Sequence, residues 1–197
     1  MSLVRKKKLV VKLFEELAEQ TARFKVDSGI KCKTGCGECC NYPKIHATVL
    51  EFIPYAYKMV IEERALDLIE KLERDANEVT ICTLFHADSP GSSNGRCSDY
   101  ENRGLIFRLY GYSANYNKEG GLNMITCSII KTNNPEVFRN AESLLARATH
   151  LPIASEYYSR LQAIDLSLSL ESYPVNVAIR KALEYVLSYY TYRNHPK

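Results

Sequence analysis

The densest group of chemically reactive side chains lies in the stretch CKTGCGECC, residues 32–40. This stretch contains four of the chain's seven cysteines, with two glycines between them: Cys32, Cys36, Cys39 and Cys40. Closely spaced thiolates bind metal or cross-link, and the glycines favour metal, because a chain that wraps an ion makes tight turns, often with positive φ. Inert packed thiols are the alternative, but the intervening residues are polar. The spacing therefore predicts a metal or cluster site.

The other cysteines lie far away in the sequence, at Cys82, Cys97 and Cys127. We expect the middle of the chain to fold back over residues 32–40, so that all seven thiolates are candidate metal ligands. Cys36 and Cys39 have the two-residue separation that is common in single-ion chelation. Adjacent side chains such as Cys39 and Cys40 diverge in helices and strands. They therefore bind one ion only in an unusual turn, serve different ions, or divide into one ligand and one packed thiol.

Seven thiols exceed one tetrahedral zinc site and fall one short of two four-thiolate sites. The residues that could supply an eighth ligand are His46, His86 and Asp99. Four thiolates suit zinc and iron–sulfur clusters about equally, so the residues leave the choice between zinc and iron open.

Cys32, Cys36 and Cys39 also have the C-x3-C-x2-C spacing that radical S-adenosylmethionine enzymes use for a [4Fe–4S] cluster. Those enzymes usually carry an aromatic residue before the third cysteine, where this chain has Glu38. The remainder of the chain also lacks the alternating strand and helix pattern of a β/α barrel. A radical enzyme is therefore disfavoured.

Length and charge narrow the function classes. The 197 residues predict a single domain, 1–197, within which residues 32–130 form the metal-binding region. Because the net charge is only +3, we expect no nucleic-acid partner. We also expect no signal peptide and no membrane association, and hence a cytoplasmic protein in which thiols stay reduced. The basic run of residues 5–8 is interpreted as a solvated helix start.

The hydrophobic pattern predicts a mainly α fold with a small antiparallel, loop-rich β region for the metal, an α+β arrangement. A capping box at Thr48–Glu51 introduces the clearest helix, starting near Ile53 or after a short turn before Pro54. Helices are predicted over 9–27, from about 53 to 76, 134–148, 155–164 and 174–192. Strands are predicted around 79–85, 105–109 and 124–130, with a turn at Asn94–Gly95 and a loop over 113–121. Residues 166–170 fit either a helix end or a strand.

These residues resemble the YkgJ-type cysteine-cluster family, the CxxCxxCC proteins that are described as zinc- or iron-chelating. The family's C-x2-C-x2-C-C run appears as Cys36–Cys40, with Cys32 one residue further out. Its second block, C-x-[IV]-Y-x-x-R-P-x-x-C-R, is matched here at four positions: Cys97, Tyr100, Arg103 and Arg108. Asp99, Gly104 and Phe107 depart from it, standing where Ile or Val, Pro and Cys are usual.

The resemblance covers about residues 32–130 and implies a zinc or iron site, with Cys82 and Cys127 as the cysteines on either side of the second block. With phenylalanine at position 107, the chain has one thiol fewer than the family pattern. Either a metal site that used this cysteine is changed, or the cysteine was a packed core residue that phenylalanine replaces. We favour the packing explanation. Arg103 and Arg108 either neutralise an anionic thiolate site or form ordinary salt bridges with Asp99 or Glu101, and the sequence leaves both open.

The leading hypothesis is a metal-binding protein whose bound ion cross-links its loops. Whether it is an enzyme, and whether it has a protein partner, stays open. A protein-modifying enzyme is the second hypothesis, because this domain type is associated with a flagellin lysine methylase, although no G-x-G-x-x-G loop is present. The third is a redox or metal-handling module that uses Cys39 and Cys40.

Overall fold

The computed structural model describes residues 1–32, 37–42, 44–75, 81–89, 92, 94–147 and 150–191. The protein is mainly helical with small antiparallel sheets, as the sequence predicted. Its helices are α1 (Leu3–Ser28), α2 (Glu38–Asn41), α3 (Ile53–Ile61), α4 (Ala65–Arg74), α5 (Leu105–Leu109), α6 (Ser128–Asn133), α7 (Pro135–Leu144), α8 (Ala154–Ile164), α9 (Leu166–Ser169) and α10 (Val175–Thr191), with a 3-10 turn η1 at Leu50–Phe52.

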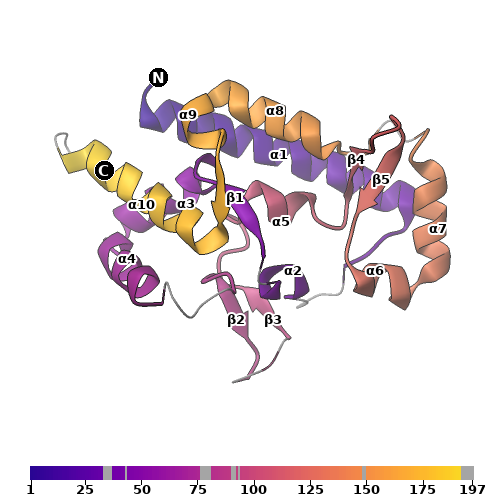
Figure 1. The fold of residues 1–197 in the computed structure, drawn as a ribbon, viewed down its shortest axis with the longest axis horizontal. Helices are drawn as coiled ribbons and strands as arrows, with labels where there is room; N and C mark the ends of the chain where they lie inside the picture. The colour runs from indigo at the N-terminus through magenta and orange to yellow at the C-terminus, as the bar shows by residue number, and fades with distance from the viewer. Residues whose placement is uncertain are drawn as a thin grey trace.

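The strands pair as two-stranded antiparallel ribbons. β1 (His46–Thr48) pairs with β6 (Ser172–Pro174), and β2 (Phe85–Ala87) pairs with β3 (Gly95–Cys97). The third ribbon joins β4 (Ser113–Tyr116) and β5 (Leu122–Ile125). Figure 1 shows β2 and β3 beside α2 at one edge of the molecule, while β4 and β5 lie at one end near α6 and α7.

Two groups of buried side chains form the core. In the larger one, α1, α3, α8 and α10 pack together, and α10 lies along α3 and α4 (Figure 1). The smaller one lies around Phe24, Ile30 and Tyr112, near β4 and α7. Helix α1 contributes to both groups, because its apolar stripe continues from Val10 to Phe24 as the spacing predicted. None of the helices in the described ranges is long and apolar enough to cross a membrane.

The first helix begins earlier than its apolar pattern indicated. Ser2 caps it by accepting a hydrogen bond from the Arg5 N–H, and Gly29 ends it with φ of 73°, the predicted left-handed terminus. The basic run is not wholly solvated, because Lys6 is buried. Its ammonium lies 2.5 Å from Asp165 and 2.7 Å from the Tyr185 hydroxyl, and so ties α1 to α9 and α10.

Glu51 is a fully buried carboxylate that joins two parts of the chain. It accepts hydrogen bonds from the Thr48 N–H at 2.8 Å and the Thr48 hydroxyl at 3.1 Å, which confirms the capping box. Its second oxygen accepts from the Ile106 N–H at 3.0 Å, at the first turn of α5. Burial raises the pKa of Glu51, while the hydrogen bonds from Thr48 and α5 act in the opposite direction. Glu51 thereby fixes the start of α5 against η1.

The predicted helix from 53 to 76 is wrong as a single element. The chain breaks between α3 and α4 at residues 62–64, where Glu63 has φ of 57°. A non-glycine residue in this conformation stops the helical hydrogen-bond ladder, so the apolar stripe continues on a second helix. Pro54 lies in the first turn of α3, so the helix proper does start at Ile53.

Several predicted strands are also wrong. Residues 105–109 form helix α5, in which Leu105, Phe107 and Leu109 are all buried. Because residues two apart lie on opposite sides of a helix, α5 is buried on more than one side, and its alternating apolar residues resemble a strand. Strand β2 starts only at Phe85, β4 occupies part of the predicted loop, and residues 128–133 form α6. Residues 76–80 lie outside the described ranges. Asn134 and Pro135 start α7 as predicted, and residues 166–169 are helical.

We predict that Glu51→Ala destabilises the protein by about 3 kcal/mol, because it leaves the Thr48 and Ile106 N–H groups buried without partners. This loss corresponds to a fall in melting temperature of about 6–12 °C. Circular dichroism melting of the metal-free protein measures it. Glu15→Ala, at an exposed position on α1, is the control and is expected to shift the midpoint by less than about 2 °C. Equal shifts in the two variants would contradict this role of Glu51.

Candidate metal centre

Four cysteines from three separate segments meet at the edge formed by α2, β2 and β3. Cys39 and Cys40 lie in α2, Cys82 precedes β2, and Cys97 ends β3. Cys40 and Cys82 are buried, and Cys39 and Cys97 are partly buried against the larger core group. We call these four residues the cysteine cluster: Cys39, Cys40, Cys82 and Cys97. The middle of the chain therefore does fold back onto α2, which forms the end of the predicted cysteine loop.

Backbone hydrogen bonds fix the segments that carry the cluster. The Cys82 N–H donates to the Cys40 carbonyl at 3.3 Å, and the Cys40 N–H donates to the Gly37 carbonyl at 2.8 Å. Residues Phe85 and Cys97 are register partners in the β2–β3 ribbon. The cysteines of α2 and of the ribbon are thus held by main-chain contacts as well as by side-chain packing.

Asn176 holds the Cys82 segment from the opposite end of the sequence. Its side-chain oxygen accepts from the Thr83 N–H at 2.8 Å, and its amide nitrogen donates to the Ile81 carbonyl at 2.8 Å. Asn176 lies in the first turn of α10, so the C-terminal helix clamps both neighbours of Cys82. Sequence reasoning missed this residue, because nothing local distinguishes it from any other polar residue near a helix start.

Glycines bring α2 close to the ribbon. A Cβ atom on Gly37 would lie 2.1 Å from the Phe85 ring and 2.8 Å from the Gly95 carbonyl oxygen. Gly37 has φ of −97°, so it is needed for close approach and not for the positive φ that the sequence suggested. Gly95 is equally restricted, because its Cβ would lie 2.3 Å from the His86 carbonyl oxygen.

The thiols of the cluster share protons. Cys40 hydrogen bonds with Cys39 and Cys97, which lowers the pKa of each of these two thiols from 9.0 to about 7. The pKa of Cys40 is raised by the same two hydrogen bonds and by burial. Burial raises the pKa of Cys82 to about 12. In the metal-free protein, Cys39 and Cys97 therefore ionise first, and Cys40 keeps its proton.

Two of the predicted ligands lie elsewhere. Cys32 and Cys127 line a pocket of about 450 Å³ whose described lining contains no member of the cysteine cluster. The Cys32 N–H donates to the Tyr112 hydroxyl at 2.8 Å, and Cys127 is the N-cap residue of α6. Cys36 lies outside the described residues. The structure therefore divides the six described cysteines into a group of four and a pair.

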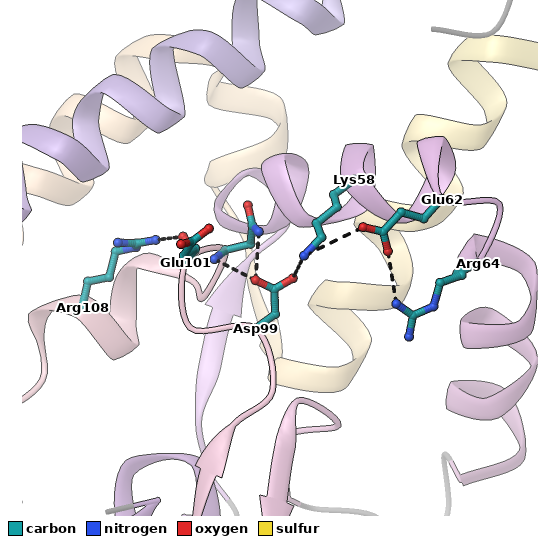
Figure 2. A network of polar contacts seen from close by, with 7 residues as sticks. Lys58, Glu62, Arg64, Asp99, Glu101 and Arg108 are labelled. Carbon is teal, nitrogen blue, oxygen red and sulfur yellow. Dashed lines mark hydrogen bonds and ion pairs between the residues drawn. The ribbon is translucent and has the colours of Figure 1, made fainter. Parts of the chain in front are cut away.

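The candidates for an eighth ligand are exposed or are already engaged. His46 and His86 are exposed, on β1 and β2. Figure 2 shows Asp99 bonded to Lys58, whose ammonium lies 2.7 Å away, and to a neighbouring amide. That amide is the side chain of Asn102, at 2.9 Å. Phe107 is buried in the larger core group, in agreement with a packing role at the position where the family has a cysteine.

The donor set fits zinc or iron by its chemistry. Thiolate sulfur is a soft ligand that both metals accept, and two of the cluster's thiols ionise near neutral pH. Within the described ranges, no group of three or more Cys, His, Asp or Glu side chains is already arranged around a single ion. The case for zinc or iron thus rests on the chemical type of the ligands, which are thiols, and on their coming together from three segments of the chain.

A mainly helical fold that gathers thiols from distant segments defines a cysteine-cluster protein. The chain belongs to the CxxCxxCC family, whose model matches residues 31–139 and is described as a "putative zinc- or iron-chelating domain". This match confirms the family that the cysteine spacing and the second block indicated, and it supports metal binding. No curated protein and no solved structure matches the chain.

We predict that Gly37→Ala disrupts the contact between α2 and the ribbon, because the new methyl group overlaps the Phe85 ring and the Gly95 carbonyl. Overpacking of this kind costs about 1–3 kcal/mol. Urea unfolding of the metal-free protein measures the loss. Gly121→Ala is the control, because its Cβ would come no closer than 3.1 Å to a described atom, the Asn117 side-chain nitrogen. A stability of Gly37→Ala equal to that of the control would show that α2 does not pack as described.

Thiol labelling tests the proton sharing. The lowered pKa values of Cys39 and Cys97 give these two thiols a larger ionised fraction at pH 7 than Cys82, whose pKa burial raises to about 12. We expect iodoacetamide to modify Cys39 and Cys97 well before Cys82, and the rate to fall as the pH decreases from 8 to 6. Peptide mass spectrometry after short exposures gives each rate. Labelling of Cys82 as fast as Cys97 would contradict the arrangement.

Proposed function

We propose that the protein binds one zinc or iron centre through the thiolates of the cysteine cluster. The observation that carries this proposal is the meeting of Cys39, Cys40, Cys82 and Cys97 in a chain of the zinc- or iron-chelating family. Isolated packed cysteines need no such meeting, since free thiols pack singly as small hydrophobic groups. Cys32, Cys36 and Cys127 remain predicted ligands, of which Cys32 and Cys127 suit a separate role on their own pocket.

The chemistry that a bound ion supplies here is cross-linking of the chain. Cys39 and Cys40 hold α2, Cys82 holds the segment that Asn176 clamps, and Cys97 holds the end of β3. Because the unfolded chain does not hold these segments together, the binding free energy also becomes folding free energy. Cys40, which keeps its proton most strongly, has to lose it when it becomes a ligand.

We infer that the protein works in a reducing compartment such as the cytoplasm. Each of the six described cysteines is a free thiol. Thiolate centres of this kind require reduced cysteines, which cytosolic conditions maintain.

The choice between zinc and iron is tested by elemental analysis and visible spectroscopy of protein prepared without oxygen. A colourless protein with zinc indicates a single-ion thiolate site. A brown protein with iron and sulfide indicates an iron–sulfur cluster. A preparation that contains neither metal, even after reduction and reconstitution, would contradict the proposed function.

We predict that metal at 100 times its dissociation constant stabilises the protein by about 2.7 kcal/mol. The melting temperature should then exceed that of the chelator-treated protein by about 5–10 °C. Cys40→Ser and Cys97→Ser should abolish most of this difference. Cys127→Ser tests whether the separate pocket of Cys32 and Cys127 contributes to this metal site. We expect this variant to keep the wild-type difference in melting temperature between the metal-loaded and the chelator-treated protein. Identical melting curves with and without chelator would show that no structural metal is present.

A further inference from the structure

A pocket of about 420 Å³ lies between helices α3 and α4 and the β2–β3 ribbon. This volume is within the range of about 300–1,000 Å³ that is usual for small-molecule sites. Residues from both helices, from the turn that joins them and from the segments that follow Cys82 and Cys97 line it. Its described lining contains no member of the cysteine cluster, so the pocket is separate from the candidate metal centre.

Backbone contacts fix the walls of this pocket. The positive φ of Glu63 ends α3 and turns the chain, and the Arg64 N–H donates to the Met59 carbonyl at 2.9 Å. On the ribbon side, the Ser98 N–H donates to the Leu84 carbonyl at 2.7 Å. Both walls are therefore held by main-chain hydrogen bonds that a ligand in the pocket would leave intact.

Tyr55 is a buried tyrosine whose hydroxyl group is unused. It lines the pocket and is only 5% exposed. Within the described residues its hydroxyl forms no hydrogen bond, and yet it is not among the unpartnered side-chain atoms that are closed off from solvent. The hydroxyl therefore opens to solvent through the pocket that the side chain lines. Burial raises the pKa of Tyr55, so the hydroxyl keeps its proton and is a hydrogen-bond donor.

The lining also carries two charges of opposite sign that have no partner in the described ranges. Asp67 and Lys71 lie one turn apart on α4, and none of the ion pairs of the described residues includes either of them. Arg64 is already paired with the exposed Glu62 at 3.1 Å, as Figure 2 shows. Apart from the exposed imidazole of His86, the unpaired charges of the lining are therefore one carboxylate and one ammonium group.

Much of the remaining lining is apolar. Met59 and Leu84 are buried, and Leu68 and Phe85 are partly buried. A small-molecule site typically combines such an apolar surface with a few polar groups that fix the orientation of the ligand. The pocket thus offers an apolar surface together with an acid, a base and a hydroxyl donor.

We propose that this pocket binds a small zwitterion with an apolar body, namely a free amino acid with an apolar side chain. Its ammonium group pairs with Asp67, its carboxylate accepts from Lys71 and the Tyr55 hydroxyl, and its side chain packs on the apolar lining. A ligand of this class satisfies both unpaired charges at once, whereas a simple anion or cation leaves one of them without a partner. Neither the pocket nor this ligand requires bound metal, so this function is additional to metal binding.

The experiment records amide NMR spectra of the nitrogen-labelled protein during titration with L-phenylalanine, L-leucine or L-methionine. We expect saturable shifts of the backbone signals of Leu68, Leu84 and their neighbours in the pocket. Phenylpropionate lacks the ammonium group and phenylethylamine lacks the carboxylate. Because each loses a hydrogen bond between charged groups, each should bind about 10–100-fold more weakly than L-phenylalanine.

Variants of the lining test the assigned contacts. Asp67→Asn and Lys71→Met each remove one charge and should weaken L-phenylalanine binding about 10–100-fold. Glu119→Gln and Lys118→Met are the matched controls, at exposed positions between β4 and β5, and should change the affinity less than about twofold. Tyr55→Phe should also weaken binding. Its melting temperature should stay within about 2 °C of the wild type, because the hydroxyl has no hydrogen bond to a described residue to lose.

Several results would overturn the proposal. The absence of saturable shifts with all three amino acids would exclude the ligand class, and so would equal affinities for L-phenylalanine and phenylpropionate. Wild-type affinity in both Asp67→Asn and Lys71→Met would exclude the site. A fall in the melting temperature of Tyr55→Phe as large as that expected for Glu51→Ala would show that the hydroxyl has a structural partner. None of these results bears on metal binding, which metal analysis tests separately.

Discussion

The cysteine region depends on one electrostatic constraint, which is that several thiols packed together cannot all ionise unless positive charge joins them. The cluster satisfies this constraint without metal by keeping a proton on Cys40, which hydrogen bonds with Cys39 and Cys97. In the proposed metal-bound form, a divalent cation would satisfy it more fully, because the cation would replace that proton and engage the buried Cys82 as well. The metal-free form and the proposed metal-bound form are then two solutions to the same charge problem.

The helical framework explains why the segments meet at all. A two-residue turn before β2 cannot position Cys82 by itself, and Asn176 does so from α10, which is packed along α3 and α4. Glu51 plays a similar part for the segment after Cys97, because it anchors the start of α5 to η1. In both cases a polar side chain forms hydrogen bonds with backbone groups of a distant segment. The packing of the helices therefore determines the conformation of these loops.

The sequence predicted the features whose causes are local. The capping box at Thr48 and Glu51, the helix end at Gly29 and the start at Asn134 follow from short-range hydrogen bonding and backbone preference. The split between α3 and α4 was missed, because Glu63 adopts a positive φ that its residue type does not signal. Residues 105–109 were misassigned because alternation over so few residues does not distinguish a strand from one buried turn of helix.

The candidate site shows the same division. Clustering of Cys39 and Cys40 with Cys82 and Cys97 was expected from composition and family pattern, but the separate location of Cys32 and Cys127 was not. Which thiols meet is decided by which elements pack, and that depends on contacts such as Cys82 with Cys40 that span dozens of residues. Spacing identifies likely donors, whereas only the fold assigns them to groups.

Two of the three departures from the family's second block, Gly104 and Phe107, fit the packing around the loop that carries Arg103. Gly104 has φ of −61°, which proline would also adopt, so the backbone has kept the conformation that the usual residue imposes. The space beside it is taken by the Phe52 ring, which a Cβ at this position would approach to 2.9 Å. Phe107 similarly fills the core where a smaller cysteine is usual. Gly104 and Phe107 are thus accommodated by packing against Phe52 and in the larger core group, while the block keeps its arginine at Arg103.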